Sequence, residues 1–240
     1  MRGGKGLLVM AVLFFGGLQV IQAQTNFQRL KSFGFPTIST GASPFAGLIQ
    51  GTNGNFYGTA NSGGSNQNGV VFQLKKNGMY TVLHQFNGQD GSGPQAELLQ
   101  ASDGALYGTT YGGGANGLGT LFKLNVDGSN FADLHHFTSA DGIKPNGGLL
   151  EGREDGVLYG TTSTGGPINT NGGTAFSVNK DGTGFVMLYN FSGNAGGEPN
   201  EGVAEGVDGA LYGTTAAGGK LFARDHFPTS KKRHGTDGVV

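Results

Sequence analysis

The tripeptide Tyr-Gly-Thr recurs four times along the chain, and this repetition constrains the fold more than any other feature. Its tyrosines are Tyr57, Tyr107, Tyr159 and Tyr212, which are successively 50, 52 and 53 residues apart. A period of about 50 residues lies in the range of propeller blades and exceeds that of leucine-rich, ankyrin or tetratricopeptide units. The spacing therefore predicts an array of similar β-units.

Each copy divides into four short strand-like segments. In the second copy they are residues 97–100, 105–110, 120–125 and 131–137, which are alternating or aromatic-rich in character. Asp-Gly joins the first segment to the second and the third to the fourth, and this pair between apolar runs predicts a hairpin with a type I′ turn. The other copies carry Asn-Gly or Asp-Gly pairs at the same points, beginning at residues 53, 77, 155, 181 and 208. We interpret these side chains as turn residues and not as catalytic or metal-binding groups.

The fourth segment is apolar on both faces. In the third copy Phe185, Met187 and Phe191 alternate with Val186 and Leu188. A sheet that is apolar on both faces must be covered on both sides, as a propeller blade is by its neighbours. We expect an all-β, propeller-like array of about four four-stranded blades, with repeats near residues 48–97, 98–148, 149–202 and 203–222.

The phase of the repeat indicates how the array closes. Residues 27–33 align with a fourth segment, whereas the last copy stops after its third segment at Phe222. An N-terminal strand that completes a C-terminal blade would remove exposed sheet edges. The last copy is also shortened before Phe222, so an incomplete propeller is the alternative.

Both ends of the chain lack the repeat. Arg2 and Lys5 precede an apolar run over residues 7–18, and Ala23 follows, so residues 1–23 are predicted to be a cleaved signal peptide. A membrane anchor is the weaker alternative, because a spanning helix needs about 20 apolar residues. Residues 24–222 are expected to form the repeat domain, and residues 223–240 a disordered tail or the product of a frameshifted or truncated gene.

Composition narrows the class of protein. The 49 glycines among 240 residues, with regularly spaced aromatic residues, favour many short strands and tight turns. The chain has no cysteine, so it holds neither a disulfide nor a thiolate metal site. Between residues 24 and 222, 14 Asp and Glu exceed 9 Lys and Arg, which disfavours a nucleic-acid partner. We expect no cofactor, and no integral membrane span after signal cleavage.

The ordered set of motifs resembles a known family. A proline precedes the first segment by four residues, and Asp-Gly-x-Leu-Tyr-Gly-Thr-Thr, Gly-Gly, Phe-x-Leu and Leu-His-x-Phe follow, across residues 27–222. This set is similar to the bacterial GloVer-type tandem repeat. The resemblance implies a secreted or surface-displayed, propeller-like array, and it supplies no catalytic residues.

Binding residues are expected on one rim of the array, opposite the tight turns. That rim holds the second-to-third loops (residues 61–69, 111–119 and 163–173) and the blade-to-blade loops (residues 87–97, 138–148 and 192–202). The candidate ligand-binding residues on these loops are Asp90, Tyr111, Asn116, Asp141 and Glu198. The carboxylates would bind a cation or sugar, and Tyr111 would replace the tryptophan that the chain lacks.

Histidine is a candidate metal ligand, and His135 and His136 are adjacent. Neighbouring strand residues point to opposite faces, so this pair cannot chelate one ion. The position of His135 is held by Lys31, His84 and Tyr189 in other copies. We therefore expect it to pack between blades.

The primary hypothesis is a secreted, extracellular, cell-surface or periplasmic binding or structural module for a polymer or protein ligand, carbohydrate included. Its distinctive residues recur, whereas an active site normally has singular ones, so the sequence leans against an enzyme. One alternative is a propeller-type polysaccharide hydrolase or lyase with Asp90, Asp141 and Glu198 near the axis. The other is a fragment of a longer repeat protein.

Overall fold

The computed structural model describes residues 9–14, 17–22, 29–33, 40–167, 171–192 and 196–217. Contacts divide the chain into two units, Met1–Ser32 and Phe33–Val240. In the first unit, β1 (Val9–Phe14) pairs antiparallel with β2 (Gly17–Gln22). This pairing does not test the predicted signal peptide, which stays a prediction, and the predicted tail lies outside the described residues. No helix long and apolar enough to cross a bilayer occurs in the described part of the chain.

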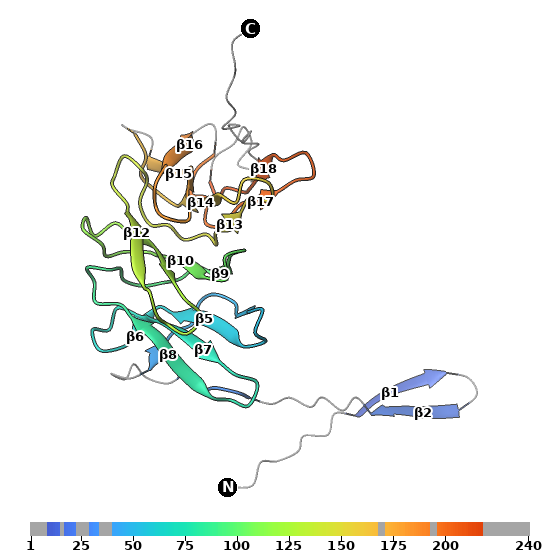
Figure 1. Ribbon diagram of the computed structural model, residues 1–240. Helices are drawn as coiled ribbons and strands as arrows, with labels where there is room; N and C mark the ends of the chain where they lie inside the picture. Colours follow the sequence, from blue (N-terminus) through green and yellow to red (C-terminus); the bar gives the residue numbers. More distant parts are fainter. Residues whose placement is uncertain are drawn as a thin grey trace. The chain divides into compact units, whose positions relative to one another are not determined.

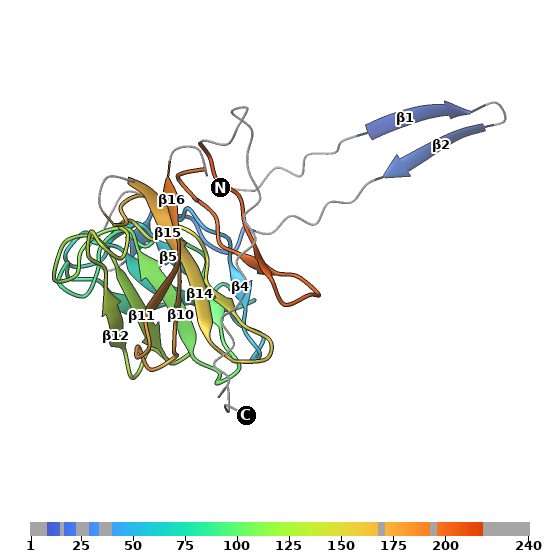
Figure 2. The ribbon, with the colours of Figure 1, turned by 90° about the horizontal axis from the view of Figure 1, so that it is seen from above.

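The second unit is an all-β array in which each repeat forms its own antiparallel sheet (Figure 1). The first sheet has the order β4-β5-β7-β8, the second β9-β10-β11-β12 and the third β13-β14-β15-β16, and β17-β18 begins the fourth. In Figure 2, β12, β11 and β10 lie in that order across one sheet. The strands are β3 (Gly41–Ala42), β4 (Ile49–Gln50), β5 (Phe56–Ala60), β6 (Ser62–Gly63), β7 (Val70–Leu74), β8 (Tyr80–Gln85), β9 (Leu99–Gln100), β10 (Leu106–Thr110), β11 (Thr120–Leu124), β12 (Ala132–His136), β13 (Leu150–Glu151), β14 (Leu158–Thr162), β15 (Asn171–Val178), β16 (Val186–Ser192), β17 (Ala204–Glu205) and β18 (Leu211–Tyr212).

The predicted four-segment repeat is confirmed. All four strands of the second sheet fall within the segments expected for the second copy. The described residues hold three four-stranded sheets, the first two strands of a fourth, and the separate two-stranded sheets β1-β2 and β3-β6. Residues 29–33 carry no strand and Phe222 lies outside the described residues, so closure of the fourth blade by residues 27–33 stays a prediction.

The tight turns join the strands as expected, but their type differs from the prediction. In the second copy the amide of Gly104 donates to the carbonyl of Ala101, and the amide of Ala101 donates to that of Ala105. Gly104 has a φ of 82°, whereas Asp103 is not among the residues with positive φ. This is the three-residue loop in which a turn is followed by one left-handed glycine, and not the predicted type I′ turn with two.

The recurring motif is explained by a bond between the turn and the second strand. The Asp103 carboxylate accepts the amide of Ala105 at 3.1 Å and the hydroxyl of Tyr107 at 2.7 Å. The third and fourth copies repeat the hydroxyl bond at 2.7 Å, from Tyr159 to Asp155 and from Tyr212 to Asp208. The turn acids therefore serve the fold, as predicted.

The glycine of Tyr-Gly-Thr is required by packing. A Cβ on Gly108 would lie 2.6 Å from the ring of Phe122 and 2.8 Å from the side chain of Leu98. The threonine that follows, Thr109, donates to the carbonyl of Pro145, in the loop just before the third sheet. The motif thus connects its own sheet to the neighbouring one.

The hydrophobic core lies between the sheets. Phe86 of the first repeat packs against Phe122 of the second, with ring centroids 5.2 Å apart. Phe137 of the second packs against Phe176 of the third at 5.3 Å. All four rings are fully buried, which confirms that each sheet is covered by its neighbours.

Phe33 repeats this geometry at the start of the unit. Its ring lies 5.3 Å from that of Phe72 and 5.9 Å from that of Tyr80. Phe86 stands in the same relation to Phe122 and Phe131. Phe33 thus occupies the place of a fourth-strand phenylalanine before the first sheet, in agreement with its alignment in the repeat.

Replacing Phe86 with alanine is expected to lower the free energy of unfolding by about 3–5 kcal/mol, because a fully buried ring leaves a cavity that its neighbours cannot fill. Phe45, whose side chain is 68% exposed, is the matched control, and Phe45→Ala is expected to change stability by less than about 0.5 kcal/mol. Urea unfolding followed by circular dichroism measures both. Equal losses in the two variants would contradict the inter-sheet core.

Candidate functional site

The two kinds of long loop share one rim, as predicted, and backbone bonds join them. Ser92 and Gly112 form a β-bridge between a blade-to-blade loop and the next second-to-third loop, and Ile143 and Thr164 form the equivalent bridge one repeat later. The amide of Gly114 also donates to the carbonyl of Gly88 at 2.9 Å. These loops are therefore held by regular hydrogen bonds.

Asp90 and Asp141 on this rim are bound to histidines. The Asp90 carboxylate lies 3.0 Å from Nε2 of His84, and the Asp141 carboxylate lies 3.2 Å from Nε2 of His135. Asp90 also accepts the backbone amide of Asn87 at 2.8 Å. Both carboxylates thus pair with a histidine of their own repeat.

The two histidines pack between blades, as predicted. The ring of His84 stacks on Phe131 with centroids 3.6 Å apart, and His135 stacks on Phe185 at 4.0 Å. Burial lowers the pKa of both histidines, although the neighbouring aspartates oppose this effect. Each His-Asp pair therefore links two sheets, because the aspartate on the rim loop holds a histidine whose ring packs on the following sheet.

Glu198 does not match Asp90 and Asp141. Its φ of 57° and the bond from its amide to the carbonyl of Gly172 match those of Lys144, whose φ is 59° and whose amide donates to Leu118. Glu198 thus belongs to the position three residues beyond Asp141.

Each predicted residue has its own contacts. The ammonium group of Lys144 lies 5.3 Å from the ring centre of Tyr111. Asn116 donates to the carbonyl of Phe137 at 3.0 Å. In the described ranges, no hydrogen bond or ion pair joins any two of Asp90, Tyr111, Asn116, Asp141 and Glu198.

Asp90 lines a surface hollow of about 560 Å³, with Asp133 and His136 among the other lining residues. Burial raises the pKa of Asp133, His136 opposes the rise, and Asp90 adds to it. Among the described residues, no group of three or more His, Cys, Asp or Glu side chains is placed to hold a metal ion.

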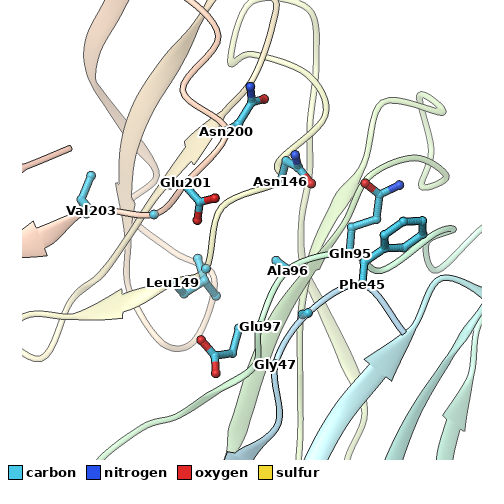
Figure 3. Close-up of a pocket in the computed structure, with 13 residues that line it drawn as sticks. Phe45, Gly47, Gln95, Ala96, Glu97, Asn146, Leu149, Asn200, Glu201 and Val203 are labelled. Atoms are coloured by element: carbon cyan, nitrogen blue, oxygen red, sulfur yellow. The ribbon is translucent and has the colours of Figure 1, made fainter. Parts of the chain in front are cut away.

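A different set of residues forms a cavity at the inner ends of the blade-to-blade loops. Four segments, each just before the first strand of one of the four sheets, surround a volume of about 570 Å³ (Figure 3). We call this the axial cavity. Its lining residues are Phe45, Ala46, Gly47, Gln95, Ala96, Glu97, Asn146, Gly148, Leu149, Asn200, Glu201, Gly202 and Val203.

Glycines allow the axial segments to approach one another. A Cβ on Gly202 would collide with the carbonyl oxygen of Gly148 in the preceding repeat, and a Cβ on Gly147 would lie 2.5 Å from the backbone of Glu201. Larger residues here would separate the third and fourth repeats. The close approach brings side chains of different repeats to one cavity.

The axial cavity presents polar groups that the fold leaves unbound. In the described part of the chain, the side chains of Asn146 and Asn200 make no hydrogen bond, and neither do those of Glu97 and Glu201. Gln95 donates from Nε2 to Asn61 at 3.1 Å, which leaves its carbonyl oxygen available. A volume of this size is typical of sites for small ligands or single residues of a polymer, which occupy about 300–1,000 Å³.

None of Asp90, Tyr111, Asn116, Asp141 and Glu198 is among the residues that line the axial cavity, and their role in binding stays a prediction. Gln95 and Asn146 lie within the predicted rim loops, yet the acidic pairs Asp90-Gly91 and Asp141-Gly142 drew the inference instead. A usable signal existed, because the residue after each recurring proline differs between repeats while the proline does not.

A family model for the Gloeobacter/Verrucomicrobia repeat matches residues 17–225. The chain belongs to this repeat family. Among solved structures, this repeat protein resembles a chain of the nidogen/laminin complex, with 17% identity and a TM-score of 0.53 over 72% of the present chain and 57% of that one. It also resembles a gluconolactonase from Xanthomonas campestris, with 17% identity and a TM-score of 0.51 over 77% and 62%.

The repeat protein therefore has a β-propeller fold. It spans only 57% and 62% of the two solved chains. At this identity the likeness concerns the fold alone. No curated protein matches the chain.

Lowering the pH from about 7.5 to about 5.5 is expected to lower the melting temperature of the repeat protein. The folded state holds the pKa of His84 and His135 below their ordinary value of about 6.5. The unfolded chain then takes up protons first, so the stability is complete above about pH 6.5 and is lost as the pH falls toward the folded pKa. Differential scanning calorimetry across this range measures the loss.

The matched control is the double variant His84→Tyr/His135→Tyr. It copies the third repeat, where Tyr189 packs 4.9 Å from Phe191 as His84 packs 4.9 Å from Phe86. Its melting temperature should depend less on pH in this range. An unchanged pH dependence would show that other groups cause the loss.

Proposed function

We propose that the protein is an extracellular binding module, secreted or held at the cell surface, that receives part of a polymer or protein ligand in the axial cavity. The convergence of four repeats on one cavity carries this proposal. The side chains of Asn146, Asn200, Glu97 and Glu201 make no hydrogen bond within the described protein and line this cavity, so they are available to a ligand there.

Extracellular localisation is supported by the sequence of residues 1–23, with its basic start, apolar run and Ala23. The excess of acidic residues supports a ligand other than nucleic acid. A binding role, and not a catalytic one, is supported by the pairing of Asp90 with His84 and of Asp141 with His135.

The double variant Asn146→Ala/Asn200→Ala is expected to weaken ligand binding at least about tenfold, because two free amides are removed from the cavity. Its melting temperature should stay close to that of the wild type, since these side chains make no hydrogen bond to the described protein. Binding is measured by calorimetry and thermal shift against dextran, xylan, cellulose oligomers, collagen and casein.

The control is Asn66→Ala, which removes the same kind of side chain from an exposed position on a second-to-third loop, outside the axial cavity. This variant should bind like the wild type. Equal loss in both variants would contradict an axial site, and so would a ligand that the wild type and the double variant bind equally well.

A polysaccharide hydrolase or lyase is the second candidate, because Glu97 and Glu201 both line the axial cavity. Paired carboxylates provide the acid and the nucleophile or base of glycoside hydrolysis. Release of reducing ends from the same polysaccharides, abolished by Glu97→Gln or Glu201→Gln without loss of binding, would favour catalysis. Binding without release would favour the module.

A further inference from the structure

The residue that follows the recurring proline differs in chemistry between the copies. A proline stands at the same point of each copy, at residues 44, 94, 145 and 199, and an apolar residue follows four positions later. The residue directly after the proline is Phe45, Gln95, Asn146 or Asn200. Since the fold needs the same backbone in each copy, this variation is not explained by the packing of the repeat.

All four of these side chains line the axial cavity (Figure 3). Phe45 is 68% exposed, so one face of an aromatic ring is available to a ligand. The other three residues present amides, each of which offers both a donor and an acceptor. Gln95 is held in place by its bond to Asn61, which orients its free carbonyl oxygen.

The lining excludes several classes of ligand. No Lys or Arg is among the residues around the cavity, and Glu97 and Glu201 would repel phosphate, nucleic acid or an acidic sugar. A purely apolar ligand would leave the amides and carboxylates without hydrogen bonds, which is costly. The described residues also hold no cluster of three or more His, Cys, Asp or Glu side chains for a metal ion.

A neutral sugar ring matches each group. Its C–H face can stack on an aromatic ring, whereas its hydroxyl groups both donate and accept hydrogen bonds, as amides require. We infer that the axial cavity recognises a neutral saccharide segment, with Phe45 as the stacking surface and Gln95, Asn146 and Asn200 as partners of its hydroxyl groups. This inference rests on the proposed function and names its ligand class.

The chain has no tryptophan, so the variant Phe45→Trp of the full chain carries a single fluorophore in the cavity and keeps an aromatic surface. It is titrated with neutral oligomers of glucose, xylose and mannose, and with oligogalacturonate as the acidic counterpart. At least one neutral oligomer is expected to give a saturable change in tryptophan fluorescence. Oligogalacturonate is expected to bind at least about tenfold more weakly.

Two controls separate stacking and hydrogen bonding from general contact. Adding Asn146→Ala/Asn200→Ala to Phe45→Trp should weaken binding at least about tenfold, and adding Asn66→Ala should leave it unchanged. By calorimetry on the chain without tryptophan, Phe45→Leu should bind about tenfold more weakly than Phe45→Tyr, because leucine is apolar but has no ring.

The saccharide assignment is overturned if no neutral oligomer binds, if oligogalacturonate binds more tightly, or if Phe45→Leu equals Phe45→Tyr. Its failure is distinct from failure of the proposed function. Binding of collagen or casein that Asn146→Ala/Asn200→Ala abolishes would retain the axial site and overturn the saccharide. If no ligand of any class responds to these substitutions, both are overturned.

Discussion

Each sheet of this propeller is apolar on both faces, so its aromatic rings are buried only when the next repeat is in place. Phe86 and Phe137 end their strands against the third-strand rings of the following sheet, and all these rings lose their contact with water. A buried aromatic side chain contributes about 1.5–3 kcal/mol relative to an exposed one. Stability in this fold is therefore shared between neighbouring repeats and does not reside in any one of them.

Polar contacts set the register of that packing. In the second, third and fourth copies, the acid of the turn before the second strand accepts a hydrogen bond from the tyrosine of its own sheet. Thr109 donates to the carbonyl of Pro145, in the loop before the third sheet. The His84–Asp90 and His135–Asp141 pairs connect the rim loops to rings of the following sheet. Because such contacts recur in several repeats, the segments before the first strands arrive at equivalent places around the axis.

The residues that build the repeat differ from the residues that line the axial cavity. Most recurring residues are used by the fold, and the position after the proline is free to differ between copies. Its four side chains meet in the axial cavity although they are distant in the sequence. A repeat fold can in this way assemble a ligand site from single substitutions, one in each copy, without altering the packing that holds the copies together.

The sequence by itself determined the repeat, the four strands of each sheet, the turn positions and the packing role of His135, because these depend on local patterns that recur in every copy. It also placed the two kinds of long loop on one rim. The turn type was missed because the strands adjoining Asp103-Gly104 are joined by a three-residue loop, a matter of register that local composition does not encode. Only the tertiary structure showed that Asp90 is occupied by His84 and that Phe45, Gln95, Asn146 and Asn200 share a cavity. The reason is geometric: residues about 50 positions apart become neighbours only when the sheets are arranged around a common axis.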